Sequence, residues 1–265
     1  MGGYVFADCP FDIRFVKGDE YYEDFYSAEA MTDSDRITVC DFDDISISSY
    51  GVEYITEKNN RILRSKSNPT SMLFANDDWS DVKICRGYNG KYGEELMTTA
   101  VYFKLCKYKT LLMHASFVDL NGDGVIFTGP SGIGKTTQAQ LWEKNLGATI
   151  VNGDKVFVRD FGDEAYAYGT PWRGSSEYCV NKKSSLKGIV VLSQSKNNSI
   201  KKLDFSEAIQ WVLPHIFMHH WDEKCVAEVL ATFENVLKEI PVWHLACRPD
   251  EEAVMIAKEQ IFNNG

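Results

Sequence analysis

A short glycine-rich segment carries the clearest chemistry in this sequence. Residues 129–137 read GPSGIGKTT, which completes the pattern G-x-x-x-x-G-K-[ST]. Glycines let the backbone turn its N–H groups inward toward an anion, the lysine adds a charge for the outer phosphates, and the following hydroxyl can ligate Mg²⁺. We therefore expect nine residues to bind the phosphates of a nucleotide: Gly129, Pro130, Ser131, Gly132, Ile133, Gly134, Lys135, Thr136 and Thr137.

The elements around this segment should hold it between a strand and a helix. The apolar residues 125–127 predict a short strand, and residues 137–144 predict a helix. Because the N-terminus of a helix carries a partial positive charge and unpaired N–H groups, it favours an anion at this point. The alternative is a glycine-rich turn without a ligand, and the order strand, loop and helix favours a phosphate site over it.

One carboxylate downstream of the loop is placed to act on a bound phosphate. Asp154 directly follows the predicted strand 148–151, and a strand so soon after the phosphate-loop helix should lie near it. There Asp154 would bind Mg²⁺ or accept a proton from an attacking hydroxyl. A solvated turn residue is the alternative. The D-x-x-G and N-K-x-D pair of switch GTPases is missing from suitable positions, so a kinase is favoured over a switch.

Two arginines and a histidine-rich stretch are further candidates. Arg173 lies between a tryptophan and a glycine, and it would contact a phosphate or a substrate carboxylate, or else lie in a surface loop. Arg248 would reach the same site or form an ordinary salt bridge. His215 and His219 have a spacing that can bind zinc, but no third ligand follows. We expect their stretch, HIFMHHW, to form a helix of the apolar core.

The chain divides by pattern into a β-rich part and an α/β part. Residues 1–93 contain short alternating runs that predict strands, at 36–42, 45–48 and 52–56. A helical stretch, 94–107, opens residues 94–265. Further strands are predicted at 111–120, 156–158, 189–192 and 241–247, and helices at 226–240 and 250–259. We expect an α/β phosphate-loop core behind a β-rich N-terminal region, or both parts in one compact body.

Composition limits the partners of the chain. A formal net charge of −10 argues against nucleic acid or an anionic membrane surface. No apolar run is long enough to span a membrane, and the opening MGGY lacks the basic and apolar parts of a signal peptide. Seven cysteines without a C-x-x-C pair are typical of reduced thiols. We expect a cytoplasmic protein, and a homo-oligomer remains compatible with these features.

The motifs together resemble a known family. MHASFV at 113–118, NGDG at 121–124, the phosphate loop and the strand before Asp154 are similar to the C-terminal catalytic domain of HPr kinase/phosphorylase. More broadly they resemble phosphate-loop proteins of the phosphoenolpyruvate-carboxykinase type. The segment 167–174 resembles a loop of that group, and 244–254 is similar to the end of small kinase-like members found beside modified-peptide genes. The resemblance covers about residues 95–265.

The resemblance implies roles for individual residues. His114 matches the family histidine near the transferred phosphate, and Asp154 matches the second acid of a pair. Gly153 stands in place of the first acid, which implies a kinase without the reverse phosphorylase activity. No segment matches the HPr-docking region, so HPr itself is not the expected acceptor.

We accordingly expect a kinase that transfers a phosphoryl group from ATP, or from another nucleotide, pyrophosphate or polyphosphate, with Mg²⁺ bound by Thr136 and Asp154. The expected acceptor is a hydroxyl of a peptide, a protein serine or a small alcohol such as free serine. Lys135, Asp154 and His114 are the expected catalytic residues. The alternative function is a catalytically weak nucleotide-binding regulator or scaffold, which the glycine at position 153 would fit.

Overall fold

The computed structural model describes residues 2–15, 24–26, 36–40, 60–65, 68, 70–87, 93–220 and 222–263. The chain forms two compact units, Met1–Leu105 and Cys106–Gly265. The helix expected at 94–107 therefore lies in the first unit up to Leu105. The predicted strands at 45–48 and 52–56 lie outside the described residues, whereas the strand expected from residue 36 is present.

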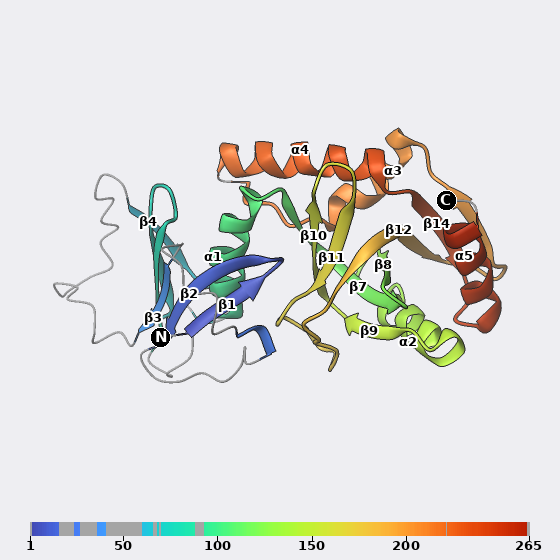
Figure 1. Ribbon diagram of the computed structural model, residues 1–265, viewed down its shortest axis with the longest axis horizontal. Helices are drawn as coiled ribbons and strands as arrows, with labels where there is room; N and C mark the ends of the chain where they lie inside the picture. The colour runs from blue at the N-terminus through green and yellow to red at the C-terminus, as the bar shows by residue number, and fades with distance from the viewer. Residues whose placement is uncertain are drawn as a thin grey trace. The chain divides into compact units, whose positions relative to one another are not determined.

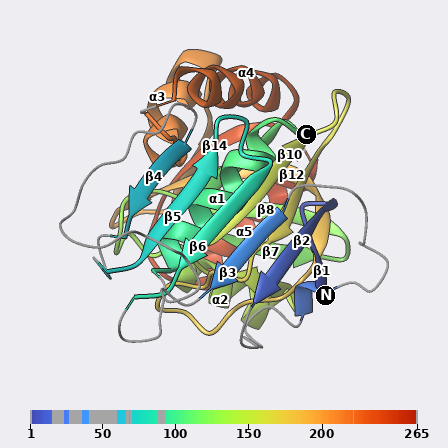
Figure 2. The ribbon, with the colours of Figure 1, turned by 90° about the vertical axis from the view of Figure 1, so that its left-hand side faces the viewer.

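In the first unit, six strands of the described residues form one sheet in the order β1-β2-β3-β6-β5-β4 (Figure 2). These strands are β1 (Gly2–Phe6), β2 (Cys9–Phe15), β3 (Arg36–Cys40), β4 (Asn60–Arg64), β5 (Met72–Asn76) and β6 (Asp81–Cys85). Helix α1 (Glu94–Cys106) packs on this sheet, where the rings of Trp79 and Phe103 stack with centroids 4.1 Å apart. Both side chains are buried, so this contact belongs to the unit's core.

The second unit is built on a mixed sheet of eight described strands (Figure 1). The order is β11-β10-β7-β8-β12-β14-β13, with β9 paired to β7 and β11 also paired to β12. The strands are β7 (Thr110–Leu120), β8 (Asp123–Thr128), β9 (Thr149–Asn152), β10 (Lys155–Asp160), β11 (Ala165–Gly169), β12 (Lys183–Gln194), β13 (Ser199–Lys202) and β14 (Val242–Cys247). The chain is therefore an α/β protein, as its sequence predicts.

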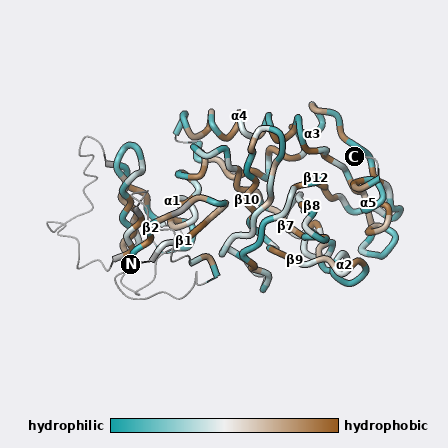
Figure 3. The backbone as a smooth tube through the Cα atoms, in the orientation of Figure 1, coloured by the Kyte–Doolittle hydropathy of each residue, from teal (hydrophilic) through white to brown (hydrophobic). Residues whose placement is uncertain are grey.

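Helices cover this second sheet, and strand alternation decides which side chains they meet. They are α2 (Lys135–Leu146), α3 (Phe205–Val212), the 3₁₀ turn η3 (Leu213–His215), α4 (Glu223–Glu239) and α5 (Glu251–Asn263). Val125 and Phe127 of β8 point to the face where Trp142 of α2 and Ile261 of α5 complete a buried cluster. Figure 3 shows apolar stretches on the strands and on the helices of this unit. Among the described residues, no helix combines the length and apolarity that a bilayer crossing needs.

Local signals account for the ends of several elements. Asn121 (φ 58°) and Gly122 (φ 95°) form the turn from β7 to β8, a conformation that glycine adopts freely. Asp250 begins α5 as expected, since its Oδ1 accepts a hydrogen bond from the N–H of Ala253, 3.1 Å away.

The prediction of a helix for the stretch HIFMHHW is wrong. Helix α3 passes into the short turn η3, and the described residues 216–220 continue without a helix. Ile216 has extended backbone angles and bridges to Met113 of β7, and the N–H of Phe217 donates to the carbonyl oxygen of Leu112 at 2.9 Å, so pairing with β7 replaces the helical hydrogen bonds. The apolar pattern was that of a buried segment, and it did not distinguish a helix from an extended one.

Candidate functional site

The phosphate loop follows β8 with backbone angles that require glycine. Gly129 (φ 142°), Gly132 (φ 76°) and Gly134 (φ 113°) all have positive φ values, which residues with a Cβ rarely adopt. Gly134 caps the N-terminus of α2, no side chain accepts a hydrogen bond at this cap, and the first turn carries no acidic residue. The first N–H groups of α2 can therefore serve an anion, as the loop pattern predicts.

Lys135 places a buried positive charge inside this loop. Its Nζ donates hydrogen bonds to the carbonyl oxygens of Gly129, at 3.0 Å, and Pro130, at 3.2 Å. Burial lowers the pKa of Lys135, and the nearby charge of Asp154 acts in the opposite direction. The structure thus brings together the loop lysine and the downstream carboxylate that the sequence separates.

The two threonines after the lysine face different neighbours. The hydroxyl of Thr136 lies 3.5 Å from the carbonyl oxygen of Gly153, in the turn that carries Asp154. Thr137 is exposed and lines a cavity that also contacts Ile133. Pro130 and Ser131 are exposed at the tip of the loop. Thr136 therefore lies on the side of the loop that faces Asp154, the expected metal ligand. Thr137 lies on the side that faces the cavity.

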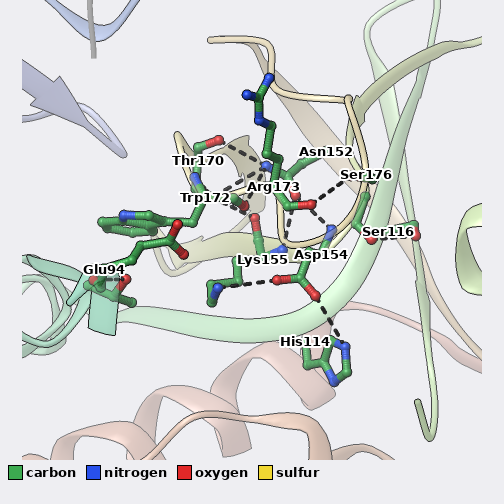
Figure 4. Close-up of polar contacts among 12 residues, drawn as sticks. Glu94, His114, Ser116, Asn152, Asp154, Lys155, Thr170, Trp172, Arg173 and Ser176 are labelled. Atoms are coloured by element: carbon green, nitrogen blue, oxygen red, sulfur yellow. Dashed lines mark hydrogen bonds and ion pairs between the residues drawn. The ribbon is translucent and has the colours of Figure 1, made fainter. Parts of the chain in front are cut away.

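Asp154 lies in the tight turn between β9 and β10 and pairs with a histidine and a lysine (Figure 4). Its Oδ1 is 3.4 Å from Nε2 of His114, and its Oδ2 is 3.2 Å from Nζ of Lys155. The β7–β10 register places His114 directly opposite Lys155. The hydrogen bond from His114 contributes most to lowering the pKa of Asp154, burial opposes it, and Lys155 lowers the pKa further. Asp154 is therefore a carboxylate at neutral pH.

The turn that carries Asp154 depends on a residue that sequence analysis did not identify. Asn152 is fully buried, and its Oδ1 accepts hydrogen bonds from the N–H groups of Asp154, at 2.8 Å, and Lys155, at 3.0 Å. Its Nδ2 donates to the carbonyl oxygens of Thr170, at 2.9 Å, and Trp172, at 3.3 Å. Asn152 thus joins the turn to the segment that resembles a family loop. The turn signal of an Asn-Gly-Asp sequence was visible, but its distant partners were not.

Two glycines allow this segment to close over the carboxylate. Gly174 has a positive φ of 58°, and a Cβ there would lie 2.6 Å from the carboxyl carbon of Asp154. Gly153 has no such backbone restriction, but a Cβ at this position would collide with the side chain of Ser176. The position that would hold a first acid is therefore occupied by the loop from Arg173 to Ser176.

The two candidate arginines lie away from the Asp154 carboxylate. Arg173 is exposed, its carbonyl oxygen accepts hydrogen bonds from Ser176, and its side chain extends away from Asp154 in Figure 4. The expectation that Arg173 binds a phosphate stays a prediction. Arg248 forms ion pairs with Asp250, at 2.7 Å, and Glu252, at 2.9 Å, which is the ordinary salt bridge considered as its alternative.

His215 lies near Lys135 and His114, a position that its sequence pattern does not predict. Burial lowers its pKa, and the charges of Lys135 and His114 lower it further. Its neighbour Ile216 bridges to Met113, which directly precedes His114 in β7. Over the described ranges, no group of three or more His, Cys, Asp or Glu side chains could hold a metal ion, so the zinc interpretation has no support there.

Comparisons with known proteins give only weak similarities. No model of a known protein family matches the chain. The chain is 25% identical over 158 residues to HPr kinase/phosphorylase of Caldanaerobacter subterraneus subsp. tengcongensis, a match that covers 58% of this chain and 48% of that protein. The chain thus spans about half the length of this curated relative. A solved structure, the Hpr(Ser) kinase/phosphatase from Coxiella burnetii, matches with a TM-score of 0.36 and 12% identity over 58% of this chain and 99% of its own. The chain is distantly similar in sequence to HPr kinase/phosphorylase.

Proposed function

We propose that the protein is a kinase that transfers the terminal phosphoryl group of ATP to a hydroxyl of a peptide, a protein serine or a small alcohol such as serine. The observation that carries this proposal is the position of the Asp154–His114 pair beside Lys135 and Thr136 of the phosphate loop. A binding loop alone would need no carboxylate at its outer end. A phosphotransferase needs one, because the acceptor hydroxyl must lose its proton.

Each residue of this site has a role in the proposed transfer. Lys135 and the N–H groups of the loop would bind the β and γ phosphates and offset their charge. Asp154 would accept the proton of the acceptor hydroxyl as its oxygen attacks the γ phosphorus, and the bond from that phosphorus to the β-phosphate oxygen breaks. His114 would hold the Asp154 carboxylate in place, or assist the acceptor itself.

The donor set also fits Mg²⁺. Proteins bind this ion through one or two carboxylates and hydroxyls, with substrate phosphates supplying further oxygens. Thr136 offers a hydroxyl on the side of the Asp154 turn, and Asp154 offers a carboxylate that is ionised at neutral pH. Bound there, Mg²⁺ would neutralise charge on the β and γ phosphates. These two side chains would hold it.

The similarity to HPr kinase/phosphorylase supports the transfer of phosphate to a serine hydroxyl in a cytoplasmic setting. The segments that resemble the small kinase-like members favour a peptide acceptor encoded beside this protein. HPr is not the acceptor that we propose, because the chain shows no match to the HPr-docking segment.

A nucleotide-binding regulator is the second candidate, and one observation favours it. Gly153 removes the first acid of the family pair, and Ser176 occupies the space that its side chain would need. A protein that had lost catalysis would bind ATP and leave every acceptor unchanged. The two candidates therefore differ in acceptor-dependent consumption of ATP.

The test incubates the protein with ATP labelled in its γ phosphate, Mg²⁺ and separate acceptors. The acceptors are free serine, small alcohols and serine-containing peptides, including any peptide encoded beside the gene. We expect label to appear in one acceptor class, with one ADP formed for each phosphate transferred. ATP binding without label in any of these acceptors would support the regulator and contradict the kinase.

A further inference from the structure

The segment after η3 continues the second sheet at the point where β8 ends. β7 pairs with β10 along one side, where Met113 lies opposite Val156. Along its other side β7 pairs with β8, beginning with Ala115 opposite Thr128, the last residue of β8. Ile216 bridges to Met113, so it occupies this second side in the place that a longer β8 would take. The segment therefore lies directly beyond β8, where the phosphate loop leaves the sheet.

This register places His215 beside the start of the phosphate loop. The bridge is antiparallel, so His215 lies opposite His114. Side chains directly opposite each other in an antiparallel pair point to the same face, with Cβ atoms about 4.5–5.5 Å apart. A β8 one residue longer would put Gly129 in this position. The carbonyl oxygen of Gly129 accepts a hydrogen bond from Nζ of Lys135, at 3.0 Å, so His215 and the loop lysine approach the same point.

The electrostatics of His215 agree with this position. Burial lowers its pKa, and the charges of Lys135 and His114 lower it further. The ring is therefore neutral at neutral pH and carries one N–H group. Within the part of the chain that the structure describes, His215 forms no hydrogen bond or ion pair, whereas His114 and Lys155 both contact the Asp154 carboxylate. The N–H group of His215 is thus available to a ligand.

An anion between Lys135 and His215 would suit both side chains. The outer phosphates are expected at Lys135, and phosphoryl transfer spreads negative charge over three equatorial oxygens that preorganised donors stabilise. Arg173, which the sequence suggests as a phosphate ligand, extends away from Asp154 in Figure 4. Arg248, the other candidate, is paired with carboxylates. His215 is a donor whose position at the loop fits the task that these two arginines leave open.

We propose that the ring N–H group of His215 binds a γ-phosphate oxygen of the donor and stabilises the phosphoryl group during its transfer. Asp154 still accepts the proton of the acceptor hydroxyl, and Lys135 still offsets charge from the loop. His215 only donates a hydrogen bond, so no proton moves and no covalent bond forms at its ring. This inference rests on the proposed function and adds to the site a residue that neither its sequence pattern nor the family resemblance assigns.

Nucleotide binding tests this contact without any acceptor. Calorimetry compares Mg·ADP with the hydrolysis-resistant Mg·ATP analogue that has a methylene group between its β and γ phosphorus atoms. His215→Phe keeps a ring but removes the N–H group, so it should weaken the analogue at least about fivefold and leave ADP unchanged, which also shows that the variant folds. His220→Phe, at an exposed histidine, should change neither affinity. Equal weakening of both ligands in His215→Phe, or an unchanged affinity for the analogue, would overturn the inference.

Single-turnover transfer supplies the second test. His215→Phe should slow transfer at least about tenfold. His215→Gln and His215→Asn bring an amide N–H near the two ring nitrogens, and at least one should stay within about fivefold of the normal rate. Normal transfer by His215→Phe, or both amide variants as slow as it, would overturn the inference and keep the kinase. A weakened analogue in His215→Phe, with no acceptor modified by the unmodified protein, would support the contact and contradict the kinase.

Discussion

The two sides of the phosphate loop differ in charge and in the direction of the strands that pair with β8. On the β7 side, pairing with β8 is antiparallel, and Ala115 lies opposite Thr128, so the early part of β7 brings His114 to the loop. On the β12 side, pairing is parallel, and the ends of β12 and β14 meet there. The first side holds Asp154, His114 and Lys155, whereas the second holds mostly uncharged groups.

This difference assigns separate tasks to the two sides. Charged groups lie where a phosphate bond would break, because transfer depends on electrostatics and a proton acceptor. Neutral groups line the other side of the loop. Changes on the β7 side should therefore lower the rate of transfer more than changes on the β12 side.

The largest expected effect comes from Asp154→Asn. The amide keeps the shape of the side chain but cannot accept the proton, and a well-placed base contributes about 10²–10⁴ in rate. We expect single-turnover transfer to fall by about this factor while ATP affinity stays within a few fold. Asp163→Asn, in the exposed turn before β11, is the matched control and should transfer at the normal rate. A normal transfer rate in Asp154→Asn would make Asp154 an ordinary turn residue.

A smaller effect, on pH dependence, is expected from His114→Ala. His114 is the main cause of the low pKa of Asp154, and burial, which raises that pKa, would remain. The carboxylate would then gain a proton at a higher pH, so the acidic decline of kcat/KM should move to higher pH. The pH profile of the exposed variant His220→Ala should match the unmodified protein. An unmoved acidic limb in His114→Ala would contradict the role of this contact.

The smallest expected effect concerns the reverse reaction, in which inorganic phosphate attacks a phosphoserine and releases pyrophosphate. We expect little or no pyrophosphate from the unmodified protein, because Gly153 leaves a single carboxylate for two anionic reactants. Gly153→Asp combined with Ser176→Gly, which removes the colliding side chain, should raise this rate modestly. Robust pyrophosphate release by the unmodified protein would show that the missing acid is not needed.

The sequence predicted the parts of the site whose signals are local. The glycine spacing indicated the loop, and the strand before Asp154 indicated a carboxylate near it. Both signals are local, because the patterns of strands, turns and helices depend on residues that are close in the sequence. The strand 111–120 and the helix cap at Asp250 followed from the same kind of signal.

The remaining parts depend on contacts between distant segments. Asn152 acts through Thr170 and Trp172, and the fit of Gly174 against Asp154 appears only when both loops are folded. His215 was assigned to a helix, but pairing of Ile216 with β7 decided its position. The residue types and their spacing in the sequence do not predict these long-range contacts.

Calorimetric titration with Mg·ATP tests the central claim, that residues 129–137 bind the phosphates of a nucleotide, most directly. The unmodified protein should bind, and Lys135→Ala should bind about ten- to a hundredfold more weakly, because the loop loses its buried cation. Lys144→Ala, which removes an exposed lysine from the same helix, should bind as the unmodified protein does. Absence of binding by the unmodified protein, or undiminished affinity in folded Lys135→Ala, would contradict the account.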